Sequence, residues 1–492
     1  MIAGFSSMLY LCGSDWLTLI CEGMAIVTMN SNEENTLGLV TTVRSKEPLR
    51  CLSNMTWVLI GTVLSHCFML AEAATERSLV NVSSIEELQS EMERSNQRIV
   101  MKPGDYLMGT RTFRLTGNNN SVDLTGVYFS WVVGEAGRGR LSITGDGNTV
   151  RNGEFEDLYQ DGTQTVTDFT AYNRDRNRLS NGGGSNVSIT GDNNRLEGFK
   201  MTVRGSYPYG YGAMFGIGRN HSLKLDKHCG IVIKGKNTVL DGVEVYQKAF
   251  CHAIFMQRPA DNTLIKNSLV EGAVRATNDM YEETDPDSLP YRFNYQMPFS
   301  IVGSRNEPGV AIPRDHMFTI TEDGIRVYTG GGSVRVENTV VKKTRGGIRL
   351  YLASDATVLN CKAIDCGSTN FNLPKGGKIS GSSGNFAYGP LSDFRLGRSN
   401  QNIDMTILPS PHAMGGHNIV DINGDGHTIV FRRAPGPLDK TDRSIVVSGK
   451  NSHIRNETEY AIELASTSSG NTVASFGKVN DKGQNNHVSS LD

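Results

Sequence analysis

Four basic side chains recur at a spacing that would place them in a single file. The pentapeptide Gly-Ile-Arg-Val-Tyr at 324–328 returns as Gly-Ile-Arg-Leu-Tyr at 347–351, an offset of 347 − 324 = 23. The same offset separates His252 from Arg275, since 275 − 252 = 23, and apolar residues flank all four basic positions. The predicted file consists of His252, Arg275, Arg326 and Arg349, with Tyr328 and Tyr351 two positions further along their strands.

These residue types suit proton transfer beside a carboxylate. The guanidinium fork of arginine pairs with a carboxylate through two hydrogen bonds, whereas histidine and tyrosine act as base or acid. Removing a proton next to a carboxylate, and protonating a leaving oxygen, needs these groups. We therefore interpret all six residues of the file as candidate catalytic residues.

A structural interpretation stands beside the catalytic one. Arg326 and Arg349 could pair with Glu322, Asp323 or Glu337 and form a ladder of ion pairs. In that case His252 would be a histidine whose hydrogen bonds are satisfied in a turn or at the surface.

Further candidates surround the file. Lys248 and Arg258 flank the strand of His252 and would add positive potential, and aromatic residues near 207–211 could stack on sugar rings or pack their own loop. The predicted substrate-binding residues are Lys248, Arg258, Tyr207, Tyr209 and Tyr211. An acidic stretch holds Asp279, Glu282 and Glu283, for which we consider calcium binding, hydrolytic catalysis or a solvated acidic loop.

The elements that would position the file are short strands stacked in coils. Ile325 and Val327 alternate with Arg326 and Tyr328, so the apolar pair faces one side and the polar pair the other. A repeat of this length, rich in β-branched and turn-forming residues, is typical of one coil of a parallel β-solenoid. Stacking would bring Arg349 to about 4.8 Å from Arg326.

Asparagines mark the start of several coils. Asn148, Asn193, Asn237 and Asn262 each follow a turn and open a strand, and their successive sequence intervals are 45, 44 and 25. The first two intervals are close to twice the repeat, so either an unmarked coil or an insertion lies between them. Stacked asparagines would satisfy backbone groups from coil to coil.

A helix precedes the first coil. The segment Ser84-Ile85-Glu86-Glu87 matches a capping box, and Leu88 and Met92 follow at a helical spacing. Such a helix would shield the open end of the solenoid core from water. Two stretches, 207–228 and 278–320, interrupt the period and are predicted to be long surface insertions.

The amino-terminal part looks composite. An apolar run from Trp57 to Leu70, followed by Ala71-Glu72-Ala73, predicts a secretory signal peptide over 55–74. Residues 1–54 are then predicted to be an N-terminal extension from a start codon assigned too far upstream, with Met55 as the true initiator methionine. The β-solenoid is predicted over 75–476 and a disordered tail over 477–492. We expect a secreted monomer without a membrane span in its mature form.

Composition restricts the partners. The 492 residues include 54 glycines against 15 prolines and carry a formal net charge of −2. Such a charge gives no general attraction to nucleic acid, so a polyanion would have to bind a local basic patch. After the predicted cleavage, Cys229, Cys251, Cys361 and Cys366 remain. A disulfide is considered for each pair, but we expect buried thiols.

The capping helix, the first strand Ile99-Val100-Met101-Lys102-Pro103-Gly104-Asp105-Tyr106 and the coil pattern resemble the right-handed parallel β-helix proteins, including pectate-lyase-like and chondroitinase-B-like lyases. The resemblance spans about residues 75–475. It implies an all-β fold: a single-stranded right-handed parallel β-helix, or solenoid, with an N-terminal capping helix. The catalytic pattern of the chondroitinase-B-like lyases has no match here, so no catalytic residue is transferred.

The leading functional interpretation is a secreted lyase that cleaves an anionic, uronate-containing polysaccharide by β-elimination. The first alternative is a glycoside hydrolase, with candidate carboxylates on Asp279, Glu282, Glu283 and Glu322. The second is a carbohydrate-binding or adhesion solenoid without catalysis. A C5-epimerase, which shares the proton-abstraction step, is a smaller alternative. The sequence indicates no cofactor with certainty, and calcium is the one considered.

Overall fold

The chain divides into two units, Met1–Glu76 and Arg77–Asp492, and each is described by itself. In the computed structural model, the second unit is described over 77–492 except for 134–138, 160–162, 164, 166–183, 206, 209–227, 285–312, 411–412, 414–415, 438 and 440. In the first unit only the backbone of four strands is described. The predicted signal peptide at 55–74 lies outside the described residues.

The first unit contains an antiparallel sheet in the order β1-β2-β3-β4. Its strands are β1 (Met8–Gly13), β2 (Trp16–Cys21), β3 (Ala25–Ser31) and β4 (Leu37–Gly38).

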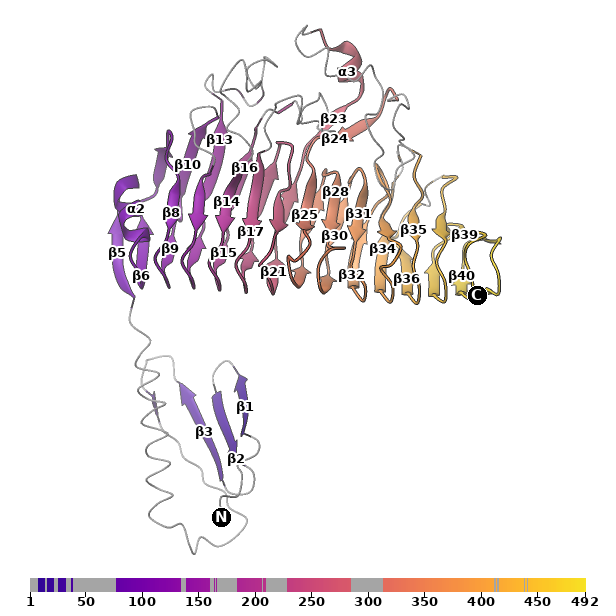
Figure 1. The fold of residues 1–492 in the computed structure, drawn as a ribbon, viewed down its shortest axis with the longest axis horizontal. Coiled ribbons are helices and arrows are strands. Elements are labelled where there is room, and N and C mark those ends of the chain that lie inside the picture. The colour runs from indigo at the N-terminus through magenta and orange to yellow at the C-terminus, as the bar shows by residue number, and fades with distance from the viewer. Residues whose placement is uncertain are drawn as a thin grey trace, which may run out of the picture. The chain divides into compact units, whose positions relative to one another are not determined.

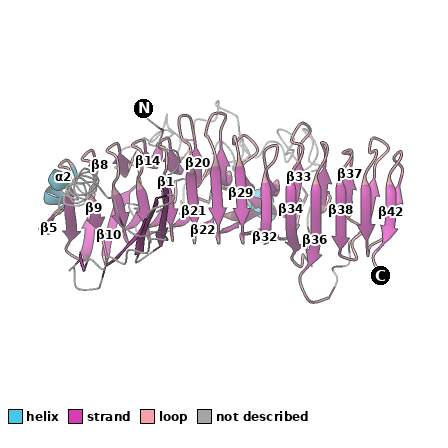
Figure 2. Ribbon diagram, turned by 90° about the horizontal axis from the view of Figure 1, so that it is seen from below, coloured by secondary structure: helices cyan, strands magenta, loops and turns pink. Residues whose placement is uncertain are grey.

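The second unit is an elongated stack of coils built from two long parallel sheets (Figure 1). This confirms the predicted all-β parallel β-helix. In the described part of the chain, one sheet has 13 strands and the other 23. Strands of successive coils lie side by side along the stack (Figure 2).

The 13-stranded sheet carries the repeated pentapeptides. Its strands are β8 (Phe113–Leu115), β11 (Leu141–Ile143), β14 (Ser185–Ile189), β17 (Cys229–Ile233), β20 (Ile254–Met256), β25 (Asp323–Val327), β28 (Gly346–Arg349), β31 (Thr369–Asn372), β33 (Ser392–Phe394), β35 (Val420–Ile422), β37 (Ile445–Val447), β39 (Ile462–Leu464) and β41 (Val479–Asp481).

The 23-stranded sheet contains two runs of strands, which converge at β32. The first run is β5 (Ser78–Val82), β6 (Gln97–Met101), β9 (Ser121–Asp123), β12 (Thr149–Arg151), β15 (Arg195–Glu197), β18 (Val239–Asp241), β21 (Thr263–Lys266), β26 (Val334–Glu337), β29 (Ala356–Leu359), β32 (Lys378–Gly384), β34 (Asn402–Ile407), β36 (Thr428–Arg433), β38 (His453–Glu457), β40 (Thr472–Ser475) and β42 (His487–Ser490). The second run is β7 (Gly104–Leu107), β10 (Val127–Val132), β13 (Glu154–Leu158), β16 (Lys200–Val203), β19 (Glu244–Gln247), β22 (Leu269–Glu271), β27 (Val340–Lys342) and β30 (Lys362–Ile364). Strand β32 pairs with both β29 and β30, so later coils carry one long strand in place of two shorter ones.

The register of the repeated pentapeptides is confirmed. Ile325 pairs with Ile348 and Arg326 with Arg349, across β25 and β28. Ile254, Ile325 and Ile348 share one inward column and are fully buried. Burying each such side chain stabilises the fold by about 1.5–3 kcal/mol relative to an exposed one, before conformational entropy is subtracted.

The asparagine turns also stack as predicted. Asn193, Asn237 and Asn262 adopt positive φ angles of 59°, 54° and 51°, which asparagine tolerates better than most residues. The side-chain amide of Asn237 donates to Asn193, and that of Asn262 donates to Asn237, both at 2.9 Å. The interval of 44 residues between Asn193 and Asn237 reflects an insertion within one coil, because Val187 of β14 pairs directly with Ile231 of β17.

The N-terminal helix is present. Helix α2 (Ile85–Met92) begins after Ser84, whose hydroxyl accepts a hydrogen bond from the Glu87 amide at 3.2 Å. Leu88 and Met92 are buried in the main core, which places the helix over the first coil. The predicted capping role is thereby confirmed.

The prediction of a disordered tail over 477–492 is wrong. Strands β41 and β42 lie within it and pair with β39 and β40. The amide of Asn471 donates to the side-chain oxygen of Asn486 at 3.0 Å, so the asparagine hydrogen bonding reaches the last coil. The polar composition was misleading because backbone pairing with the preceding coil needs few apolar side chains.

One coil is enlarged by an arm. Between β22 and β25 the chain forms β23 (Val274–Ala276), α3 (Asn278–Glu282) and β24 (Met317–Thr319), and β23 pairs with β24 antiparallel. These elements project from one edge of the stack (Figure 1). The insertion therefore begins before Arg275, slightly earlier than the sequence predicted.

Candidate functional site

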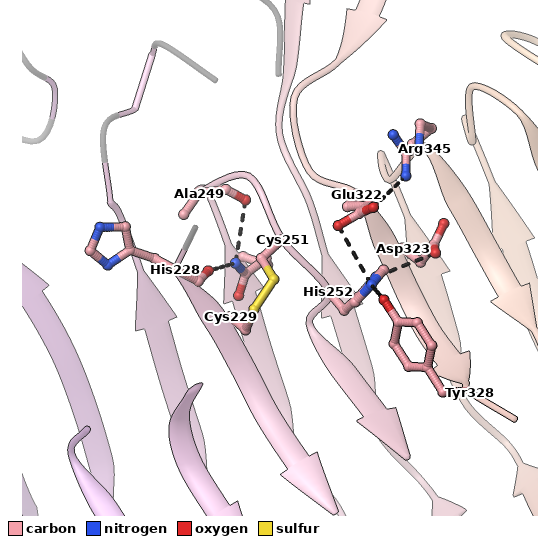
Figure 3. The surroundings of a disulfide bond; sticks show 10 residues. His228, Cys229, Ala249, Cys251, His252, Glu322, Asp323, Tyr328 and Arg345 are labelled. Atoms are coloured by element: carbon pink, nitrogen blue, oxygen red, sulfur yellow. Dashed lines mark hydrogen bonds and ion pairs between the residues drawn. A yellow bond between two sulfur atoms is a disulfide. The ribbon is translucent and has the colours of Figure 1, made fainter. Parts of the chain in front are cut away.

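The site lies on the 13-stranded sheet around β20, β25 and β28. His252, in the turn before β20, reaches across to the next coil, where its Nε2 atom lies 2.6 Å from the hydroxyl oxygen of Tyr328 and 3.5 Å from Glu322 Oε2. Its Nδ1 atom lies 3.3 Å from Asp323 Oδ2. Figure 3 shows the imidazole between these three side chains. Polar atoms therefore lie close to both ring nitrogens.

Asp323 is the buried anion of the site. Its side chain is 1% exposed and pairs with Arg349 Nη1 at 2.9 Å, while Arg326 Nη1 lies 3.8 Å away. Burial alone would raise the pKa of this carboxyl, but Arg349 and then His252 outweigh burial and hold it well below its usual value. Asp323 is therefore ionised, which favours a proton on the facing Nδ1 of His252 and leaves Nε2 to accept from the Tyr328 hydroxyl.

A glycine makes this ion pair sterically feasible. Gly346 pairs with Asp323 across β25 and β28. A Cβ atom at Gly346 would lie 2.0 Å from Arg349 Cδ and 2.4 Å from Asp323 Oδ1. Any larger residue would push the guanidinium away from its carboxylate.

Two tyrosines on neighbouring coils face one guanidinium. The Cζ atom of Arg326 lies 5.3 Å from the Tyr328 ring centre and 4.7 Å from that of Tyr351. Arg326 Nη2 also donates to the Tyr351 hydroxyl at 2.8 Å, and the Cζ atom of Arg395 lies 4.2 Å from the Tyr351 ring centre. Such contacts combine cation–π attraction with a charge-assisted hydrogen bond.

The two phenols have opposite pKa shifts. Burial, and then the negative charge of Glu322, raise the pKa of Tyr328 to about 12. Burial also opposes ionisation of Tyr351, but Arg326 and Arg349 outweigh it and lower the pKa of that phenol. When a catalytic acid and a catalytic base are the same type of side chain, their pKa values are expected to be shifted in opposite directions.

Arginines and carboxylates are balanced in number at the site among the described residues. Arg326, Arg345, Arg349 and Arg395 lie with Glu322, Asp323, Asp393 and Asp421, the last of which pairs with Asp393 across β33 and β35. Burial raises the pKa of Asp393, which weakens its negative charge. In the part of the chain that the structure describes, the buried donors Nε and Nη1 of Arg326 and Nε of Arg349 have no hydrogen-bond acceptor. The cluster can therefore attract an anion.

The predicted open file is wrong in three respects. Phe255, not Arg275, pairs with Arg326, because Ile254 of β20 pairs with Ile325 of β25 and the whole arm lies between them in sequence. In the same register His252 lies level with Asp323, three positions before Arg326. Arg275 lies on the arm, where its Nε is 3.1 Å from Asp279 Oδ2. The side chains of His252, Arg326 and Arg349 are only 4%, 11% and 9% exposed, so ion pairing and packing hold them within the protein surface. His252, Arg326, Arg349, Tyr328 and Tyr351 nevertheless meet in one cluster.

The remaining basic and aromatic candidates lie apart from this cluster. Lys248 is half-buried near Glu271, and its pKa is lowered by burial. Tyr207 belongs to a turn in which its amide donates to the Arg204 carbonyl at 3.0 Å. Arg258 lines a surface hollow beyond the end of β20. Tyr209 and Tyr211 lie outside the described residues.

The acidic candidates lie on or beside helix α3. Asp279 pairs with Arg275, and Glu283 Oε2 lies 3.9 Å from Arg275 Nη2. Glu282 is exposed. Across the described ranges, no group of three or more histidine, cysteine or acidic side chains is arranged to hold a metal ion.

Two members of the site were missed from sequence. Arg345 Nη2 pairs with Glu322 Oε1 at 2.7 Å, and the repeat offset could have revealed it, because 345 − 322 = 23. Arg395 lies in an irregular stretch where no repeat pointed to it. Glu322 and Asp323 were considered only as structural partners of the arginines or, for Glu322, as a hydrolase carboxylate.

A disulfide borders the site. Cys229 and Cys251 are bonded, whereas Cys361 and Cys366 are free and buried. The expectation of buried thiols is therefore wrong for the first pair. The bond ties the start of β17 to the residue before His252 (Figure 3), and both cysteines belong to a buried cluster with Phe255 against which Tyr328 packs. Within the described residues, no helix is long and apolar enough to cross a membrane.

Neither a protein-family model nor a curated protein matches this chain. Solved parallel β-helix structures do match. A mannuronic-acid-specific family 6 polysaccharide lyase from the human gut microbiota is 11% identical, with a TM-score of 0.42, covering 84% of this chain and 83% of its own. Pectate lyase Pel9A is 11% identical, with a TM-score of 0.35 and coverages of 82% and 78%. A tailspike protein of E. coli bacteriophage HK620 is 11% identical, with a TM-score of 0.40 and coverages of 80% and 61%. The likeness concerns the fold alone.

Proposed function

We propose that this protein is a secreted polysaccharide lyase that cleaves an anionic, uronate-containing glycan by β-elimination. The observation that carries the proposal is the pair Tyr328 and Tyr351, which lie on neighbouring coils, face the same guanidinium and have opposite pKa shifts. A β-elimination needs one base and one acid close to a group that neutralises the substrate carboxylate.

The substrate carboxylate binds at the arginine cluster. Arg395 is the most accessible arginine in contact with Tyr351, with a side chain 26% exposed. Its fork can hold the carboxylate while Arg326 and Arg349, which are more buried, supply positive potential from below. Neutralising the carboxylate makes the neighbouring C5 proton acidic enough to remove.

Tyr351 is the base. Its ionised phenol is stabilised by the Arg326 hydrogen bond and by the positive charges around it. It takes the C5 proton, the electron pair forms the C4–C5 double bond, and the bond from C4 to the glycosidic oxygen breaks.

Tyr328 is the acid. Its raised pKa keeps it protonated at neutral pH, so its O–H proton can pass to the departing oxygen. Tyr328 then regains a proton that reaches it from solvent through Nε2 of His252, which Asp323 positions. Tyr351 releases the C5 proton to solvent, so the proton given to the leaving sugar is balanced by the proton taken from C5.

Secretion is part of the proposal. The Cys229–Cys251 disulfide supports it, because disulfides persist mainly in oxidising compartments outside the cytosol.

The test is a panel of alginate, pectate, glycosaminoglycans and sulfated algal polysaccharides. We expect the ultraviolet absorbance of an unsaturated uronate to rise with wild-type protein and not with Tyr351→Phe. Tyr246→Phe is the matched control, because its hydroxyl bonds Glu244 on β19, in the other sheet. A calcium requirement, proposed from the acidic residues of the arm, would appear as activity lost in chelator.

Other outcomes would contradict the lyase. New reducing ends without unsaturation would indicate a hydrolase, and exchange of the C5 proton without cleavage would indicate an epimerase. Glycan binding without any turnover would indicate a binding solenoid, in which the arginine cluster serves only structure and recognition.

A further inference from the structure

A surface hollow of about 400 Å³ lies where the chain leaves the strands that carry the site. Its lining residues lie in the turns that come after β17, β20, β25 and β28. Two of these turns also contain Tyr328 and Tyr351. Gly330 is two positions beyond Tyr328, and Leu352 directly follows Tyr351. The hollow is lined by Lys236, Arg258, Pro259, Ala260, Asp261, Gly330, Gly332, Leu352 and Ser354.

The charged groups of the hollow leave a positive surplus. The exposed guanidinium of Arg258 has no hydrogen bond or ion pair with any described residue, and the same holds for the exposed ammonium of Lys236. Asp261 is the carboxylate among the lining residues, and it accepts hydrogen bonds from the Ser333 amide and hydroxyl, both at 2.8 Å. Two cations therefore face one carboxylate that is already hydrogen-bonded.

Two glycines line the hollow, and neither position accepts a side chain without strain. Gly330 and Gly332 have φ angles of +79° and +71°, a region that glycine adopts without strain. A Cβ atom at Gly332 would lie 2.3 Å from the Ala260 carbonyl oxygen, so no side chain can grow there. Pro259, Ala260 and Leu352 add apolar surface, against which the face of a sugar ring can pack.

We propose that this hollow is a subsite for a second anionic sugar of the glycan, held by Arg258 and Lys236 while another sugar occupies the tyrosine pair. This inference rests on the proposed function and names its substrate class: a glycan that carries negative charges on sugars beside the cleaved uronate. The recognised chemistry is an anionic substituent on a sugar ring, either a carboxylate or a sulfate.

The experiment measures binding by calorimetry in the Tyr351→Phe background, where turnover is blocked. The probes are short oligosaccharides of mannuronate, of galacturonate and of sulfated galactan, with neutral xylo-oligosaccharides as reference. Arg258→Ala is compared with Arg98→Ala, which removes an exposed arginine from β6 on the first coil. We expect Kd to rise about tenfold for Arg258→Ala, further for Arg258→Ala with Lys236→Ala, and not for Arg98→Ala.

The different oligosaccharide probes distinguish the possible results. A loss confined to uronate probes identifies a carboxylate subsite, and one confined to the sulfated galactan identifies a sulfate subsite. The difference between variants should shrink at high salt, because screening weakens exposed charge pairs. Equal Kd values for Arg258→Ala and Arg98→Ala, or no binding of any anionic probe, would overturn the subsite. The lyase proposal fails separately, if wild-type protein yields no unsaturated product from the polymers.

Discussion

The Nε2 atom of His252 lies 2.6 Å from the Tyr328 hydroxyl oxygen, although 76 residues separate the two along the chain. Asp323 faces the other ring nitrogen. The arrangement connects a buried carboxylate, an imidazole and a phenol at the surface of one sheet. It gives the phenol a partner that can exchange a proton with it.

If Tyr328 is the acid, the His252–Tyr328 pair should act as a unit in catalysis. We expect Tyr328→Phe and His252→Gln each to lower kcat by about 10²–10⁴ with little change in KM. The kcat of the double variant should be hardly lower than that of either single variant, because both substitutions interrupt the same proton-transfer path. Steady-state kinetics of the four proteins measures this. Full additivity of the two losses would contradict the unit.

The pH profile should follow the two tyrosines. A base works when ionised, so kcat should rise with pH through the lowered pKa of Tyr351, which lies below 10.0, and should fall only as Tyr328 loses its proton near pH 12. Removing a cation with Arg395→Gln should raise the pKa of Tyr351 and move the rising limb to higher pH. The measurement is kcat against pH at saturating substrate. An unmoved rising limb would show that Tyr351 is not the base.

Asp323 should be a major determinant of stability. Asp323→Asn leaves Arg349 buried without its counter-charge, for which we expect a loss of about 3–5 kcal/mol in the free energy of unfolding. Because the pKa of Asp323 is depressed in the folded state, its stabilising effect is complete above its unfolded pKa of about 3.9 and is lost as pH falls below that value. Denaturant unfolding across this range checks both statements. A gap between wild type and variant that stays constant down to the lowest pH would be inconsistent with them. Asp323→Asn combined with Arg349→Met should recover part of the loss.

The Cys229–Cys251 disulfide should stabilise the coil that precedes the site. The bond closes a loop between cysteines 22 residues apart, for which chain entropy predicts a contribution of about 3 kcal/mol. Reductant should lower the unfolding midpoint of wild-type protein and leave the Cys229→Ala, Cys251→Ala double variant unchanged. Equal sensitivity of both proteins to reductant would contradict this contribution.

Arg275 should not matter for the chemical step. It pairs with Asp279 on the arm and lies outside the coil register of Arg326 and Arg349. We expect Arg275→Ala to keep the wild-type kcat, in contrast to His252→Gln. A kcat as low as that of His252→Gln would restore Arg275 to the catalytic residues.

Sequence alone determined the parts of this protein that repeat locally. The offset between the two pentapeptides correctly paired Arg326 with Arg349, because both coils have the same length and no insertion lies between them. Alternation of apolar and polar residues gave the inward column, and the capping signal before Leu88 located the helix at the start of the solenoid. Each of these patterns depends on residues within one coil or on two adjacent coils of equal length.

Tertiary structure alone decided which side chains meet at the site. An enlarged coil separates Ile254 from its partner Ile325, so extending the short offset backward placed Arg275 where Phe255 belongs. Whether an arginine faces solvent or a buried Asp323 depends on the coil stacked beside it, as does the bond between Cys229 and Cys251. A repeat fixes the distance between equivalent positions only while coil length is constant, and a single arm inserted into one coil removes that information.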